Sequence, residues 1–198
     1  MAVAAPPAPA ASSAPMLTIV FQNPSYRTLA VDRNGIAYGK STSGSDPTQN
    51  YRLYRSSDEG RSWTTLFDFP AGSNVWYLSV LGDNTLIAHV DFGPTYLYRS
   101  ADGGGSWTRV FQLPDLYRTL TPHSLTDDGR YVYLASYNTL DAGNHTNYVW
   151  RSADDGQTWT LVLQTTNHRH AHFAEVNPYT GDLYVGYGDD GAQSAIER

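Results

Sequence analysis

Three histidines alternate with other residues in one short segment of this chain of 198 residues: His168, His170 and His172. Side chains two residues apart point to the same face of an extended strand, so the spacing predicts that the three imidazoles share one face. Three imidazoles on one face could bind Zn²⁺ or another divalent metal, and His170 or His172 could supply a general base. The alternative is an ordinary polar strand whose histidines hydrogen-bond their neighbours. We expect no cofactor apart from such a metal.

Two arginines and one glutamate are the other candidates for catalytic chemistry. The tetrapeptide Tyr-Arg-Thr-Leu occurs at 26–29 and again at 117–120, which places Arg27 and Arg118 at similar positions of two repeats. Two guanidinium groups could clamp a carboxylate in bidentate fashion, although a solvated or ion-paired arginine is the simpler interpretation. Glu175 is the glutamate that the sequence offers as a catalytic carboxylate.

Aromatic and polar residues of the predicted loops and links could bind a ligand. Sugar rings stack on aromatic faces, and this chain has 5 Trp and 15 Tyr. The candidate ligand-binding residues are Trp76, Tyr77, His123, Tyr137 and Asp189.

The elements that must position these side chains are indicated by a repeat, Ser-x-Asp-x-Gly-x-Ser/Thr-Trp, at 56–63, 100–107 and 152–159. Its tryptophans are 44 and 52 residues apart, about the length of one four-stranded propeller blade. The Ser and Asp side chains can accept hydrogen bonds from turn amides, and the Gly supplies a positive φ. We therefore interpret these segments as hairpin turns and not as catalytic sites, and we expect their tryptophans to be buried in equivalent positions. The structural residues are Ser56, Asp58, Gly60, Trp63, Ser100, Asp102, Gly104, Trp107, Ser152, Asp154, Gly156 and Trp159.

The repeat resembles the Asp box, or BNR repeat, of sialidases and many other propeller proteins. The resemblance implies an all-β fold, a β-propeller of four-stranded antiparallel blades with Asp-box hairpins, and about four blades' worth of sequence. It also implies that binding sites lie at the edge opposite the Asp boxes, in loops such as 89–94, and it favours an extracellular or periplasmic location.

The repeat also predicts where the blades begin and end. Residues 1–15 read as a flexible Ala/Pro leader without the features of a signal peptide, and the remainder, 16–198, as propeller blades. The expected segments are an outer strand of a split blade at 16–22, blades at 26–70, 75–113 and 117–164, and three strands of an incomplete blade at 170–198. Either the chain is a piece of a six- to eight-bladed propeller, or 16–22 completes the last blade of a closed four-bladed ring. Open blade edges would permit self-association.

Composition excludes some functions. The 13 Lys and Arg residues against 19 Asp and Glu residues give a net charge of −6, without a basic stripe for nucleic acid. No apolar run is long enough to span a membrane, and the absence of cysteine excludes disulfides.

Two functions remain open from the sequence, besides a fragment without independent activity. One is glycan-directed: carbohydrate binding, or part of a glycoside hydrolase or polysaccharide lyase. The other is a non-catalytic scaffold that binds a protein. Sialidases carry an Arg-Ile-Pro motif before the first Asp box, and residues 26–30 read Tyr-Arg-Thr-Leu-Ala instead, which argues against sialidase activity.

Overall fold

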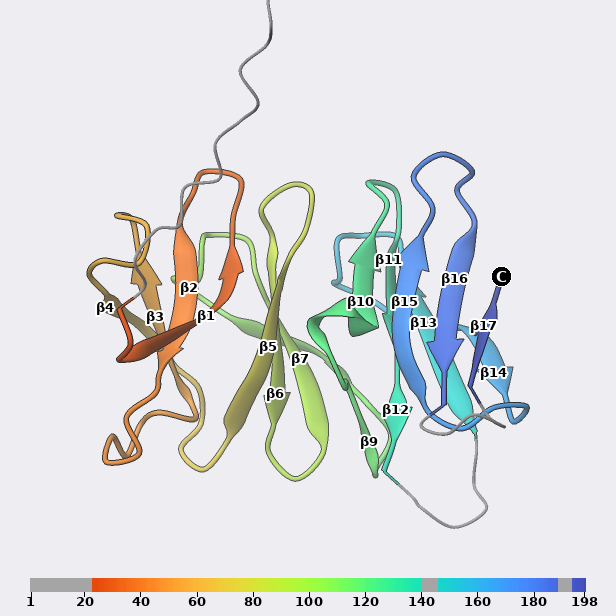
Figure 1. The fold of residues 1–198 in the computed structure, drawn as a ribbon, viewed down its shortest axis with the longest axis horizontal. Helices are drawn as coiled ribbons and strands as arrows, with labels where there is room; N and C mark the ends of the chain where they lie inside the picture. Colours follow the sequence, from red (N-terminus) through yellow and green to blue (C-terminus); the bar gives the residue numbers. More distant parts are fainter. Residues whose placement is uncertain (1–22, 140–145, 189–193) are drawn as a thin grey trace, which may run out of the picture.

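The computed structural model describes residues 23–139, 146–188 and 194–198, and in these residues the chain is built almost entirely of antiparallel β-strands. Four sheets stand side by side in chain order, from orange to blue in Figure 1. The first and fourth sheets lie at opposite ends of this row. The described sheets therefore form an open row. The expected leader at 1–15 and the outer strand at 16–22, on which the closed four-bladed arrangement depends, lie outside the described residues. Within the described residues, no helix is long and apolar enough to cross a membrane.

Each of the four sheets is an antiparallel meander whose strands follow one another in chain order, although the short strand Tyr137–Asn138 lies in the chain between the second and third strands of the third sheet and pairs outside that sheet. The first sheet contains β1 (Tyr26–Val31), β2 (Ala37–Ser41), β3 (Arg52–Ser56) and β4 (Thr64–Asp68). The second contains β5 (Asn74–Val80), β6 (Leu86–Asp91), β7 (Thr95–Ser100) and β8 (Thr108–Gln112). The third contains β10 (Leu125–Asp127), β11 (Val132–Ala135), β13 (Asn147–Ser152) and β14 (Thr160–Thr165). The fourth has three described strands, β15 (Ala171–Val176), β16 (Leu183–Tyr187) and β17 (Ala195–Glu197).

The approach to the third sheet is interrupted. A short strand, β9 (Tyr117–Arg118), pairs with β12 (Tyr137–Asn138), and a single 3-10 turn, η1 (Pro122–Ser124), then leads to β10. Pro122 has no backbone N–H to donate to a strand ladder, and the side chain of Thr121 caps the turn by accepting a hydrogen bond from the amide of His123. The first strand of this repeat is consequently split in two.

Hydrophobic side chains are buried between neighbouring sheets. Leu53, Val75 and Leu86 belong to the core between the first and second sheets, while Leu97 and Leu134 belong to the core between the second and third. A smaller core around Val149 and Ala174 joins the third and fourth sheets. Each sheet thus packs face to face on the next.

The two ends of the strands carry different connections. Turns between first and second strands and the three repeated turns between third and fourth strands lie at one edge, which is uppermost in Figure 1 and which we call the turn edge. The described loops between second and third strands, at 42–51 and 92–94, and the segments that join one sheet to the next lie at the opposite edge, which we call the loop edge.

The three repeated turns close through the same hydrogen bonds. In the second copy, Oγ of Ser100 accepts a hydrogen bond from the amide of Gly104 at 2.9 Å and donates one to Oδ1 of Asp102 at 2.7 Å. The same carboxylate accepts hydrogen bonds from the amide and the hydroxyl of Ser106. The first and third copies repeat this network at equivalent positions. The predicted turn chemistry is therefore present in all three.

The tryptophans of the repeated turns occupy equivalent but only half-buried positions. The indole N–H of each donates to the carbonyl oxygen of the turn glycine, at 3.0 Å for Trp63, 2.9 Å for Trp107 and 3.1 Å for Trp159. This bond holds each indole over its own turn, and each ring also packs on an aromatic side chain, Tyr26, Phe69 or Phe111. The three tryptophans therefore share one environment, as predicted, but they are half-buried and not buried.

Candidate functional site

Four candidate residues meet at the loop edge. Trp76 and Tyr77 from the start of β5, Arg118 from β9 and Tyr137 from β12 line one pocket with a volume of about 180 Å³. The residues come from the second sheet and from the paired strands that precede the third. The pocket therefore lies where two neighbouring repeats meet, at the edge predicted to carry a site.

A β-bulge determines the orientation of Trp76. The pairing of β5 with β6 shifts between Val75 and Tyr77, so Trp76 is the extra residue of the bulge. Its side chain is 43% exposed, an unusual position for an indole. This gives the pocket an aromatic face that a ligand can reach.

Asp91 holds two of the pocket's side chains in place. Its Oδ2 atom accepts a hydrogen bond from Nε1 of Trp76 at 3.4 Å and lies 3.9 Å from Nε of Arg118. The same carboxylate oxygen thus faces both the indole and the guanidinium group. Arg118 remains half exposed and can bind a further acceptor.

The wall behind the pocket is rigid and neutral. The hydroxyl of Tyr77 donates to the carbonyl oxygen of Leu120, and the ring packs edge-on against His89. His89 is fully buried between the hydroxyls of Ser79 and Thr119, and burial lowers its pKa to about 3. This neutral imidazole joins the second sheet to the segment that enters the third.

A second pocket, of about 320 Å³, adjoins the first through Trp76, which lines both. It lies between the first and second sheets and contains the candidate Arg27 together with Lys40. The Lys40 ammonium donates to Oδ1 of Asn74 and to the carbonyl oxygen of Val75, both at 2.7 Å. Burial and the positive charge of Arg27 lower the pKa of Lys40 to about 8.

The three histidines do not gather into a metal site. His170 has a φ of 50°, outside the extended region, and β15 begins only at Ala171, so the alternation on which the shared face depended is broken. Nε2 of His168 lies 2.8 Å from a carboxylate oxygen of Glu197, and its ring packs on Tyr187. His170 and His172 instead pack on Tyr137. In the part of the chain that the structure describes, no three His, Cys, Asp or Glu residues are placed to hold a metal ion.

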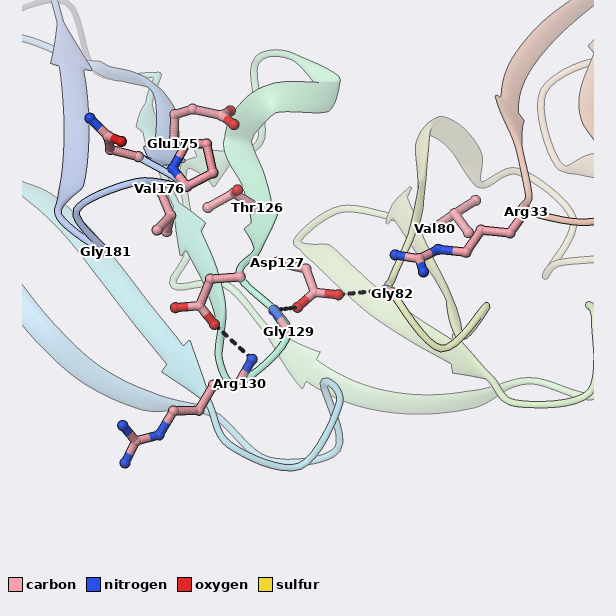
Figure 2. Close-up of a pocket in the computed structure, with 13 residues that line it drawn as sticks. Arg33, Val80, Gly82, Thr126, Asp127, Gly129, Arg130, Glu175, Val176 and Gly181 are labelled. Atoms are coloured by element: carbon pink, nitrogen blue, oxygen red, sulfur yellow. Dashed lines mark hydrogen bonds between the residues drawn. The ribbon is translucent and has the colours of Figure 1, made fainter.

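Glu175 lies at the turn edge, apart from the other candidates. Figure 2 shows it beside a pocket of about 660 Å³ that includes Arg33, Gly82, Asp127 and Arg130. The carboxylate of Asp127 accepts hydrogen bonds from the amides of Gly82 and Gly129, and thereby fastens the turn of one sheet to that of the next. This pocket is the open space between successive turns, and the carboxylates of Asp127 and Asp128 close those turns.

Comparisons with solved structures identify the arrangement of sheets. The chain is 15% identical to the GH74 xyloglucanase from Xanthomonas campestris, over 81% of this chain and 25% of that one, with a TM-score of 0.55. It is 17% identical to YCF48 bound to D1 peptide, over 91% and 53% of the two chains, with a TM-score of 0.53. The third is an α-L-arabinanase from Penicillium chrysogenum complexed with arabinobiose, which is 16% identical over 87% and 65% of the chains, with a TM-score of 0.51.

The chain has a β-propeller fold. It spans between a quarter and two thirds of the lengths of these three propeller chains. No family model matches it, and no curated protein matches it.

Two further candidates, His123 and Asp189, are not among the described residues that line the two pockets at the loop edge of the propeller. His123 is exposed on η1, where its amide serves the Thr121 cap, and Asp189 falls outside the described residues. Arg27 and Arg118 do not share a pocket: one lines the larger pocket and the other lines the smaller, with Trp76 common to both. The double clamp on one carboxylate, the alternative to a solvated or ion-paired arginine, is therefore not formed.

Sequence reasoning did not single out His89 or Lys40 at this edge of the propeller, and it placed Asp91 in a loop. His89 and Asp91 were assigned to a loop at 89–94, but β6 continues through Asp91 and places the histidine in the interior. The apolar alternation of 86–90 could have indicated that longer strand. Lys40 belongs to no sequence motif. Its pocket forms only where the first two sheets pack together, and no local pattern in the sequence indicates that packing.

Proposed function

We propose that this chain is an Asp-box propeller that binds carbohydrate at the loop edge, on the exposed indole of Trp76. The Asp-box assignment is supported by the three identical turn networks, in which one serine, one aspartate and one glycine close each hairpin. All of these hydrogen bonds lie within one turn, so they support the assignment to the Asp-box propellers. They do not bear on the ligand, which we place at the loop edge.

The observation that carries the carbohydrate proposal is the exposure and fixation of Trp76. The apolar faces of sugar rings pack on aromatic rings, and a ring held in one orientation loses less entropy on binding. Trp76 is exposed at a bulge, held by Asp91, and lines a pocket on each side. Tyr137 and Arg118 add a second ring and a hydrogen-bond donor for hydroxyl groups.

Binding fits these two pockets better than hydrolysis does. Glycoside hydrolysis generally uses two carboxyl groups on either side of the bond that is cut. The described residues that line the two pockets are aromatic, aliphatic, cationic, amide or hydroxyl residues, with no carboxylate among them. Two of the similar propellers, the xyloglucanase and the arabinanase, are glycan enzymes by name, which supports the ligand class.

A peptide-binding scaffold is the second candidate. Phe92 and Leu116 are exposed at the loop edge, and apolar side chains of this kind suit a protein partner. The similarity to YCF48, whose structure is bound to D1 peptide, supports the same possibility.

Calorimetric titration with neutral oligosaccharides of xyloglucan and arabinan tests the proposal. Trp76→Ala should weaken binding by about tenfold, because loss of an aromatic ring that stacks on a nucleic-acid base costs about 1–3 kcal/mol and a sugar ring would stack on the same face of the indole. Tyr179→Ala removes an aromatic ring that is 95% exposed at the turn edge and should leave the affinity unchanged. Equal affinities of the wild type and Trp76→Ala would overturn the proposal. Binding of peptides alone, lost in Phe92→Ala, would establish the scaffold instead.

A further inference from the structure

We infer that the larger loop-edge pocket is an anion site, formed by Arg27 and Lys40, for the carboxylate of an acidic sugar such as a uronic acid. The inference rests on the proposed carbohydrate binding at Trp76 and specifies the class of saccharide.

Two cations face each other directly across a strand pair. Arg27 of β1 is the register partner of Lys40 of β2 in the antiparallel ladder. Side chains at such positions are close, and like charges placed there destabilise a sheet. Among the described residues, neither side chain forms an ion pair with a carboxylate, although the chain as a whole carries a net charge of −6. The described part of the chain therefore provides no counterion for this pair, and an anionic ligand would supply one.

The position of the Lys40 ammonium is fixed by the neighbouring sheet. Two of its hydrogen bonds go to Asn74 and Val75 of β5, which hold it between the first and second sheets. An ammonium group has three N–H donors, so one remains after these two bonds. Lys40 is also the only lysine in the sequence.

The rest of the pocket suits a polar ligand with one negative charge. Gln49, Asn50 and Asn74 contribute amide groups that can hydrogen-bond hydroxyls, and the described lining residues include no carboxylate that would repel an anion. Asp91, which pairs with Asn74 on the next strand, is already engaged by Trp76 and Arg118.

The proximity of Trp76 selects a saccharide as the bearer of that charge. The indole lines the same pocket as Arg27 and Lys40, so a pyranose ring stacked on it has its substituents within the pocket. A uronic acid carries its carboxylate on the ring, where a cation pair beside the stacking face can reach it. The same chemistry would also accept a sulfate ester, and the test separates the two.

The test compares short oligogalacturonates with the same oligomers in methyl-esterified form, because esterification removes the charge and retains the sugar. By calorimetry, the wild type should bind the acid form at least about tenfold more tightly at low salt, and the difference should shrink as salt is added. Lys40→Met and Arg27→Gln should each remove most of that difference and leave the ester affinity within about twofold. Lys40→Arg retains the charge and should restore the preference if the methionine variant is poorly folded. Arg33→Gln, at the turn edge, is the matched control and should change neither affinity.

Each other outcome has a definite meaning. Equal affinities of the wild type for acid and ester overturn the anion site and leave Trp76 binding intact, while binding of neither form overturns the site together with carbohydrate binding of this class. Tighter binding of a sulfated oligosaccharide than of the matched uronate, lost in Lys40→Met, overturns the carboxylate assignment.

Discussion

The indole N–H of Trp76 donates to the carboxylate of Asp91, and Oδ2 of Asp91 lies 3.9 Å from the guanidinium of Arg118. One carboxylate therefore holds a stacking surface and a donor together at the mouth of one pocket. We expect Asp91→Ala to weaken saccharide binding about threefold to tenfold, because the released side chains must then be ordered on binding. Calorimetry measures the affinity, and acrylamide quenching measures the freedom of the indole. Asp91→Asn, which keeps a hydrogen-bond acceptor, should have a smaller effect, and an unchanged affinity in Asp91→Ala would show that the bond has no part in binding.

In the second repeated turn, the buried serine should contribute more to the free energy of unfolding than the exposed serine. Oγ of Ser100 is buried and bonds to both Gly104 and Asp102, so Ser100→Ala leaves polar groups without a partner. We expect a loss of about 1–2 kcal/mol in the free energy of unfolding, measured by urea denaturation. Ser106→Ala removes an exposed hydroxyl bound to the same aspartate and should cost about 0.5 kcal/mol or less. The reverse order would contradict this account of the turns.

Two features favour glycine at position 104, a positive φ and a close approach to the preceding sheet, and Gly129 has only the first of them. Its φ is 92°, and an added Cβ would lie 2.6 Å from Cδ2 of Leu66 in the preceding sheet. Gly129 has a φ of 83° with no atom within 4 Å of the same position. We expect Gly129→Ala to cost about 1–2 kcal/mol for backbone strain alone, and Gly104→Ala to cost about 1–3 kcal/mol more for the clash. Equal losses in thermal unfolding would mean that the repeated turn does not pack against its neighbour.

Acid should destabilise the repeated turns in a defined range of pH. Hydrogen bonds from Ser62 and Ser106 lower the pKa of Asp58 and Asp102 to about 2, from an ordinary value of 3.8. These carboxylates bind protons more readily in the unfolded chain than in the folded one. Their contribution to the free energy of unfolding is therefore complete above about pH 4 and is lost as the pH falls towards 2. Urea midpoints at successive pH values measure it. The double variant Asp58→Asn with Asp102→Asn should flatten the profile over this range, and an unaltered slope would contradict the assignment.

Binding of acidic saccharide should weaken in mildly alkaline solution. The pKa of Lys40 is lowered to about 8, mainly by burial, so the ammonium loses its charge as the pH rises from 7 to 9. A carboxylate binds the charged form better, and the affinity should therefore fall several-fold over this range. The groups facing Lys40 are Arg27, which stays charged, and the neutral Asn74 and Val75. Lys40→Arg should bind with an affinity independent of pH, and a persisting pH dependence would assign it to another group.

Local turn chemistry could be predicted from the sequence because its partners are close along the chain. Ser56, Asp58 and Gly60 bond only within one turn, so the residue types and spacing determine the geometry. The packing of Gly104 on Leu66, by contrast, joins two sheets, and no local pattern indicates it.

The sequence could predict at which edge of the sheets the candidate site lies, but not how its side chains are arranged. Trp76 and Tyr77 were placed at the correct edge because the repeats assign every link to one edge of the strands. The bulge that exposes Trp76 depends on the register between β5 and β6, which pairing sets and local sequence does not. The same limit explains the histidines: the positive φ of His170 breaks the alternation that the prediction assumed.

Nuclear magnetic resonance of the indole N–H groups tests the central claim most directly. The chain has 5 Trp, and Trp76→Phe assigns the signal of Trp76 in a ¹⁵N-tryptophan-labelled sample. Saturation with an oligosaccharide that binds should shift the Trp76 resonance, while those of Trp63, Trp107 and Trp159, which are bonded to their own turns, stay in place. A bound oligosaccharide that leaves the Trp76 resonance unmoved would contradict carbohydrate binding at this edge of the propeller.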